Sequence, residues 1–440
     1  MKAVNFKIIH QLAIPATISG ISEPLLSLTD TAIVGRIPEQ GAAALAAAGA
    51  VGAFLSTLIW VLGQTRSALG AVVSQHKGAQ NLKSIKTLTG QTLFFNIGLS
   101  LLIIAVCLPL ARNILVLLNT TGEVLELGTT YLQIRILGMP FTLFCFTLFG
   151  VCRGLQDTVS PMIVSLIGTA INIVLDLVLV FGLPGLISPM GLEGAAIASL
   201  LAQIIMAACT YYYIRKKHPA ITLVLRWPIH PRIKQVLQLM TNLFLRSLTL
   251  NLTLLFAVKE AAKYGTISLS AHTIGINLWL FAAFFIDGYG DSANALSGKL
   301  LGAKDAKGLL HLNRLILKYA FSLGVILTLI GFIAAPYIGY VFTEEVEVLT
   351  QFDKVFPVVL ITFPISAIAF VYDGFYKGLG EAAFLRNTLL TASLIGFLPS
   401  FYLFDSFGFN LMAVWYAIGV WMIIRALFPY FYFKLYIRRI

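Results

Sequence analysis

The chain has 440 residues, of which 58% are hydrophobic and only 11% are charged, and its formal net charge is +12. Soluble domains carry about 25% charged residues, and neither a soluble globule nor a disordered chain accommodates a mean hydropathy of +0.88. The composition therefore excludes both classes and indicates an integral membrane protein surrounded by lipid. The positive charge lies in short loops between apolar runs, so it predicts membrane orientation and not a nucleic-acid partner.

Apolar runs predict twelve transmembrane helices, because a bilayer core about 30 Å thick needs roughly 20 helical residues. In chain order the predicted spans are 10–35, 43–74, 88–118, 127–152, 161–184, 192–214, 235–261, 268–300, 311–342, 348–377, 386–405 and 408–436. They leave no stretch long enough for a separate soluble domain. The predicted fold class is an all-α polytopic membrane protein.

The distribution of basic residues predicts the orientation. With the N-terminus inside, the cytoplasmic segments hold 22 Lys and Arg residues and the outer loops hold 5. This bias places both termini in the cytoplasm, as expected for a multi-pass protein of a bacterial-type inner membrane. The four remaining basic residues lie within or at the ends of spans: Arg66, Arg135, Arg246 and Arg425.

The two halves of the chain look like copies of each other. The loop glycines Gly78 and Gly154 have counterparts at Gly302 and Gly378, and both pairs are 224 residues apart. Six spans per repeat make the two repeats parallel, related by a pseudo-two-fold axis along the membrane normal. We therefore expect an N-terminal lobe (1–217), a cytoplasmic linker (218–234) and a C-terminal lobe (235–440).

Acidic residues at membrane depth are candidates for function, because a charge there costs several kcal/mol. In the first half, Asp30 lies in the first span, and Asn172 and Asp176 share one face of the fifth. Ser199 in the sixth span adds a hydroxyl. Two carboxylates beside an amide and a hydroxyl suit a proton or Na⁺. Glu23, two helical turns before Asp30, is either a cleft residue or a locally bonded group.

The second half offers weaker candidates. Asp287 and Asp291 lie in the eighth predicted span, where pairing with Arg246 of the seventh is one interpretation and a functional role the other. Asp373, near the end of the tenth span, is expected to be a satisfied structural group.

Proline and motif patterns complete this reading. Pro15 and Pro24 interrupt the hydrogen bonding of the first span, so each is a candidate hinge or a fixed bend. No Walker motif, nucleophile elbow, CxxC pair or metal-ligand spacing occurs. We therefore expect no enzymatic activity, no metal and no cofactor.

Several segments resemble one transporter family. Ser22–Arg36, Arg153–Pro161, Asn172–Asp176 and Gly191–Ser199 are similar to signatures of the multidrug and toxic compound extrusion (MATE) transporters. Arg246 and Asp287 resemble the DinF-type branch of that family. The resemblance implies a V-shaped pair of six-helix lobes, with cation coupling at Asp30, Asn172, Asp176 and Ser199, where relatives usually have Thr at the last position. It also matches Pro15 to the family's bending proline.

The function expected from this resemblance is secondary active antiport. A monomer would export small organic, often cationic, compounds in exchange for H⁺, or for Na⁺, by alternating access. The alternative within the superfamily is a flippase for a lipid-linked precursor, which should have a more basic central cavity. A non-transporting receptor or scaffold is a third reading, disfavoured by the paired acids and by the lack of any soluble domain.

Overall fold

The computed structural model describes residues 4–37, 41–219, 221, 223–225 and 227–438, without the side chains of 23, 24, 27, 28 and 82–84. The side chains of Glu23 and Pro24, two of the candidates from the sequence, thus lie outside the described part of the structure. The described regular structure is helical apart from one isolated bridge between Leu183 and Ile187.

The helices follow one another with short connections. In the first half they are α1 (Phe6–Val34), α2 (Gly41–Leu62), α3 (Gln64–Gly78), α4 (Leu82–Leu117), α5 (Gly122–Ile136), α6 (Met139–Gly154), α7 (Val159–Phe181) and α8 (Gly191–Lys217). In the second half they are α9 (Ile233–Lys263), α10 (Thr266–Gly302), α11 (Ala306–Ile338), η1 (Gly339–Val341), α12 (Val346–Leu379), α13 (Ala382–Thr391), η2 (Ala392–Phe397), α14 (Leu398–Ser406) and α15 (Leu411–Tyr436).

These helices account for the predicted spans. Ten helical stretches in the described part of the chain are long and apolar enough to cross a membrane, and α5 with α6 forms one more, bent by 44°. Helix α1 has 29 residues, which at 1.5 Å per residue exceeds the bilayer core. Each predicted span coincides with one of these segments, so the all-helical membrane fold is confirmed.

Three predicted spans are interrupted helices, and two of the breaks lie beside a proline. The α5–α6 bend precedes Pro140, and the π-helical segment η2 is followed by Pro399. Proline lacks the N–H that would continue the regular ladder, so the helix bends or widens there. The third break, between α2 and α3, falls at Gly63.

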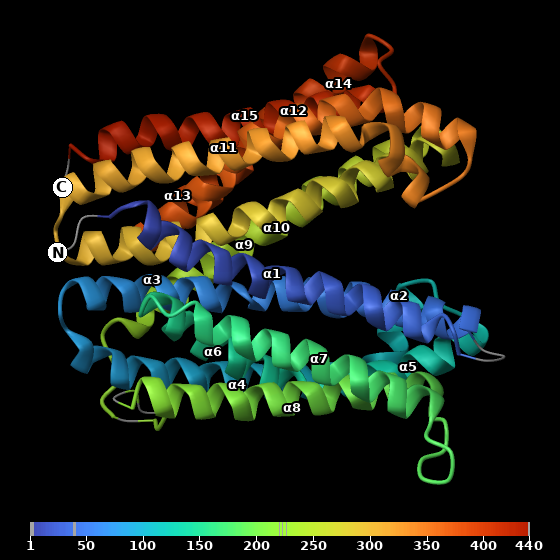
Figure 1. The fold of residues 1–440 in the computed structure, drawn as a ribbon, viewed down its shortest axis with the longest axis horizontal. Helices are drawn as coiled ribbons and strands as arrows, with labels where there is room; N and C mark the ends of the chain where they lie inside the picture. The colour runs from blue at the N-terminus through green and yellow to red at the C-terminus, as the bar shows by residue number, and fades with distance from the viewer. Residues whose placement is uncertain (1–3, 38–40, 220, 222, 226, 439–440) are drawn as a thin grey trace. The chain divides into compact units, whose positions relative to one another are not determined.

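The chain packs into two compact units. Unit 1 contains Met1–Thr17, Lys77–Gln80 and Gln238–Ile440, and unit 2 contains Ile18–His76 and Asn81–Leu237. Within unit 2, α6, α7 and α8 lie side by side, as α11, α12 and α15 do within unit 1 (Figure 1). The lobe boundaries 1–217 and 235–440 stay predictions, because packing and not chain order defines the two units.

Helix boundaries repeat at the offset of 224 residues that the sequence suggested. Helix α4 begins at Leu82 and α11 at Ala306, while α3 ends at Gly78 and α10 at Gly302. The bent pair α5–α6 corresponds to the single long helix α12, which begins at Val346.

Close helix crossings recur at the same offset. A Cβ on Gly154 would collide with the carbonyl oxygen of Gly70 in unit 2, and a Cβ on Gly378 would collide with that of Asn294 in unit 1. Each residue of the first crossing lies 224 positions before its counterpart in the second, Gly70 before Asn294 and Gly154 before Gly378. Glycine permits this close backbone approach, so the loop motifs conserve a packing geometry within the repeat.

Candidate functional site

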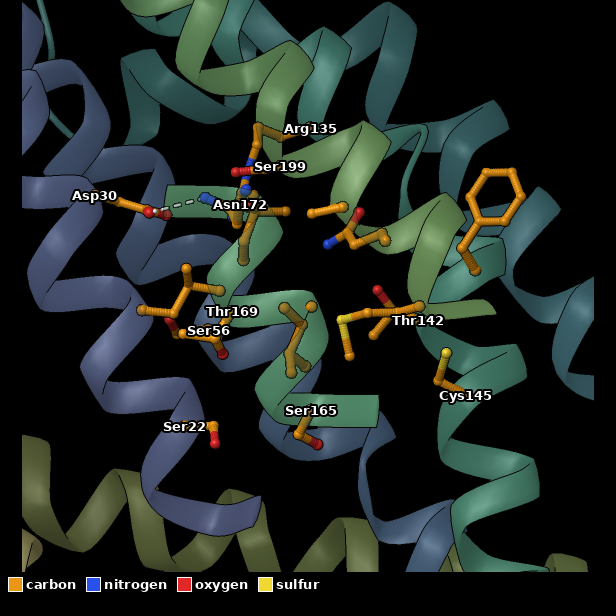
Figure 2. A pocket seen from close by; sticks show the side chains of 18 of the residues that line it. Ser22, Asp30, Ser56, Arg135, Thr142, Cys145, Ser165, Thr169, Asn172 and Ser199 are labelled. Carbon is orange, nitrogen blue, oxygen red and sulfur yellow. Dashed lines mark hydrogen bonds between the residues drawn. The ribbon is translucent and has the colours of Figure 1, made fainter. Parts of the chain in front are cut away.

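The acids expected in the first lobe come together around one amide. The Asn172 side-chain nitrogen on α7 donates to Asp30 Oδ1 on α1 at 3.1 Å (Figure 2). It also donates to Asp176 Oδ2 at 2.5 Å. Asn172 and Asp176 are one helical turn apart, which places both on one face of α7. Both are almost fully buried. The two N–H groups of a single amide thus join carboxylates that lie 146 positions apart in the chain.

Two polar atoms of this cluster lack a partner. Asp176 Oδ1 and Ser199 Oγ are buried and form no hydrogen bond with any described residue. Buried polar groups in folded proteins are nearly always hydrogen-bonded, so these two oxygens are candidates for binding a proton or a ligand.

A cavity opens beside the cluster within unit 2. Its volume is about 220 Å³, and Asp30, Asn172 and Ser199 are among its lining residues (Figure 2). Pockets for drug-sized ligands are usually 300–1,000 Å³, so this one suits a small molecule or a group of waters. Its wall also carries serine, threonine and aromatic side chains, including Ser165, Thr169 and Phe146.

Two arginines that sequence reasoning left without a role also line this cavity. Arg66 on α3 lies over the ring of Phe146 at 5.8 Å, and Arg135 on α5 lies over the ring of Tyr131 at 5.8 Å. Arg135 interacts electrostatically with both Asp30 and Asp176. The signal available in the sequence was the presence of a cation at membrane depth, which by default marks a functional residue.

The second-lobe cluster differs from the expectation. Arg246 on α9 pairs with Asp373 on α12, and not with Asp287 or Asp291, as one reading had supposed. Arg425 on α15 donates to the same Asp373 Oδ2 at 2.9 Å. The Asp373 carboxylate contacts both guanidinium groups and forms an ion pair with each of them. On α10, Asp287 is exposed and Asp291 is half-buried.

A further polar cluster joins the loop after α6 to the end of α8. Asp157 accepts from Ser160 Oγ at 2.6 Å and contacts His218 Nε2 at 3.3 Å and Lys217 Nζ at 3.6 Å. Burial alone would raise the pKa of Asp157, but hydrogen bonds from His218 and Ser160 outweigh it and hold the pKa below its usual range. Asp157 also caps the start of α7 through the Ser160 backbone N–H at 3.0 Å.

This loop cluster includes a possible metal-ligand set. Cys152, Asp157 and His218 place one ligand atom each within 4.8 Å of one another. The Lys217 ammonium beside Asp157 and the hydrogen bonds already made to that carboxylate disfavour a cation there. The prediction of no metal thus stays a prediction.

The family is decided by comparison with known proteins. The MatE family model matches residues 15–178 and 243–402, which is most of the chain. The chain belongs to the MATE family. This confirms the resemblance seen in the sequence, and the protein is a multi-pass membrane transporter and not an enzyme.

Curated relatives of this MATE protein include drug exporters. It is 27% identical to DNA damage-inducible protein F of Escherichia coli K12, over 96% of this chain and 90% of that protein. It is 23% identical to multidrug export protein MepA of Staphylococcus aureus MSSA476, over 74% and 71%. It is 25% identical to the chloroplastic protein DETOXIFICATION 45 of Arabidopsis thaliana, over 94% and 76%.

Solved structures confirm the fold. An outward-facing multidrug resistance MATE transporter matches with a TM-score of 0.90 at 20% identity, covering 98% of this chain and 96% of that one. A MATE structure in a bent conformation matches with a TM-score of 0.91 at 19% identity, covering 98% and 95%. At these identities the likeness establishes the MATE fold alone.

Of the hinge candidates, only Pro15 lies in a described part of the chain with its side chain. It is half-buried within α1, which runs as one helix through this position. Pro15 is two residues before Thr17, where α1 passes from unit 1 to unit 2. A proline leaves the carbonyl four residues earlier without its helical donor, so this part of α1 bends more easily.

Proposed function

We propose that this MATE transporter is a monomeric antiporter of a bacterial-type inner membrane, exporting small organic, often cationic, compounds in exchange for H⁺. The observation that carries the proposal is the pair of carboxylates, Asp30 and Asp176, joined by Asn172 at membrane depth. The similarity to multidrug export protein MepA supports export of organic compounds. Both termini face the cytoplasm in this proposal, in accord with the 22-to-5 bias of basic residues.

The choice of H⁺ over Na⁺ follows from the ligands available. Na⁺ needs about five or six oxygen ligands, as hard cations generally do. Asn172 turns its N–H groups, and not its oxygen, toward both carboxylates, so the amide does not complete such a shell. Arg135 adds a positive charge near the same pair. A proton needs only one carboxylate oxygen, and Asp176 Oδ1 is without a partner among the described residues.

Protonation changes the hydrogen bonding of the pair. A carboxylate accepts only, whereas a carboxylic acid also donates, so a proton on Asp176 Oδ1 removes the charge of that carboxylate, and the bond from Asn172 to its other oxygen weakens and rearranges. Because Asp30 is on α1 and Asp176 on α7, this rearrangement alters the contact between these helices. A substrate cation and a proton then compete for one negative site, and each shifts the conformational equilibrium by its differential affinity. Antiport follows from that competition.

The decisive experiment is transport in proteoliposomes with H⁺ and Na⁺ gradients imposed separately. With ethidium as the probe, we expect efflux to follow the pH gradient and to stop in Asp30→Asn and Asp176→Asn. The matched control is Asp353→Asn, an exposed acid at the start of α12. Efflux that follows Na⁺ with the pH gradient collapsed would contradict the choice of ion, and full transport by both site variants would contradict the site.

A binding measurement tests the competition itself. We expect ethidium affinity to fall as pH drops in the wild type, and Asp30→Asn to bind ethidium weakly at every pH. The reason is that the amide, like the protonated acid, carries no negative charge. An affinity independent of pH in the wild type would rule out direct competition.

A further inference from the structure

The cavity wall of unit 2 carries two arginines with unused donors. Arg66 and Arg135 both line the cavity, and the Nε of each is buried without a hydrogen-bond partner. Neither guanidinium forms a hydrogen bond or a salt bridge with any described residue. Each instead lies over an aromatic ring of the same cavity, Phe146 for Arg66 and Tyr131 for Arg135. The rings orient the guanidinium planes but satisfy none of their N–H groups.

The two buried arginines of the second half differ from Arg66 and Arg135, because they have a carboxylate partner. Arg246 and Arg425 are both neutralised by Asp373. A guanidinium at membrane depth without a partner is costly, and it is the side chain best suited to bind a carboxylate or phosphate through two parallel hydrogen bonds. The unpaired donors of Arg66 and Arg135 are therefore a ready site for an anionic group.

One acid of the proposed coupling site, Asp30, lines the same cavity, and the other, Asp176, is bonded to the lining residue Asn172. Asp30 lines the cavity together with the arginines, and Figure 2 shows Arg135 and Ser199 beside Asn172 at one end of it. The cavity thus presents negative and positive groups to the same volume of about 220 Å³. A permanent organic cation uses Asp30 alone and leaves both guanidinium groups without an anionic partner.

We propose that the substrate of this cavity is a small zwitterion, with its cationic amine against Asp30 and its anionic group against Arg66 and Arg135. This rests on the proposed proton antiport and names its substrate class. A simple anion fits the arginines but not the antiport, because protonating the acids would strengthen its binding. A zwitterion keeps the competition between amine and proton while using both guanidinium groups.

A matched set of three probes isolates each charge. Phenylalanine is the zwitterion, phenethylamine carries only the amine charge, and N-acetylphenylalanine carries only the carboxylate charge. Binding of the radiolabelled probes to purified protein in lipid nanodiscs gives three affinities at pH 8. We expect the wild type to bind phenylalanine at least tenfold more tightly than either derivative.

The variants assign the two charges to residues. Arg66→Gln and Arg135→Gln should each weaken phenylalanine binding about tenfold or more without weakening the binding of phenethylamine, while Arg135→Lys keeps part of the preference. Arg112→Gln is the matched control, since Arg112 pairs with Glu126 on the surface outside the cavity. An equal loss for phenylalanine and phenethylamine in the arginine variants would reveal a merely structural role and overturn the proposal.

Two outcomes separate this inference from the function on which it rests. If the wild type exchanges ethidium for protons but binds phenylalanine no better than phenethylamine, the inference fails and the antiport stands. If phenylalanine binding depends on both arginines but no probe is exchanged for protons, the antiport fails and the anion-binding role of the arginines stands.

Discussion

The ion cluster of unit 1 yields a prediction whose magnitude follows from burial. Asp373 accepts from Arg246 and Arg425, whose side chains are only 7% and 3% exposed. Asp373→Asn keeps the shape but removes the charge, so two buried guanidinium groups lose their counter-ion. Breaking a buried ion pair by removing one partner costs about 3–5 kcal/mol, because the remaining charge stays desolvated. We expect a loss of folding free energy in that range.

The comparison pair is Arg112 and Glu126, whose side chains are 59% and 65% exposed. Solvent screens such a pair, and its net contribution is about 0–1 kcal/mol. Urea titrations of the wild type, Asp373→Asn and Glu126→Gln in one detergent measure both effects. A loss for Asp373→Asn no larger than for Glu126→Gln would refute the reasoning.

A double variant tests the mechanism of this loss. Adding Arg425→Gln to Asp373→Asn removes one of the unpaired cations, so we expect the second change to cost less than it does in the wild type. Coupling energies for residues in contact are typically about 0.5–3 kcal/mol. Strict additivity would show that the damage comes from packing and not from the unpaired charge.

Three other perturbations follow from the structure. Pro15→Ala restores an α1 hydrogen bond and should slow ethidium exchange more than it weakens ethidium binding; an equal effect on both would exclude a hinge. Gly90→Val places a side-chain carbon against the carbonyl oxygen of Val224 and should push the linker away from α4. Limited proteolysis should then cut the linker faster than in the wild type, and an unchanged rate of cleavage would contradict this contact. Burial, and then the charges of nearby His76 and Arg232, lower the pKa of His230. The linker packing is therefore complete above pH ~6.5 and weakens as the pH falls. Protection factors of the linker amides that stay constant from pH 8 to pH 5 would disprove this.

The span pattern and the first-lobe site could be predicted because both depend on local spacing. Hydropathy over about 20 residues marks a span, and the separation of four between Asn172 and Asp176 places both on one face of α7. Their contact with Asp30 needed the family resemblance, since no spacing within a helix brings α1 to α7.

The sequence pattern could not predict which charged residues pair when they are far apart in the chain. Arg246 had three acids within reach of adjacent spans, and nothing local distinguished Asp373, which is 127 residues away, from Asp287 or Asp291. The unpaired state of Arg66 and Arg135 was equally hidden, because the absence of a partner is a property of the folded cavity. The sequence marks a buried charge, and only the packing of several helices decides whether it is neutralised.

The repeat shows where the two halves diverged. Helix boundaries recur at 224 residues, yet Arg66 and Arg135 correspond at that offset to Gly290 and Val359, and Asp373 corresponds to Phe149. Phe149 lines the first-lobe cavity. The two halves thus share helix boundaries and glycine crossings but differ in the positions of their charges. In the first half Arg66 and Arg135 face a cavity, and in the second half Arg246 and Arg425 are neutralised by Asp373. Because an ion or substrate exchanges more readily with charges that are not already paired, we expect the coupling site in the first half.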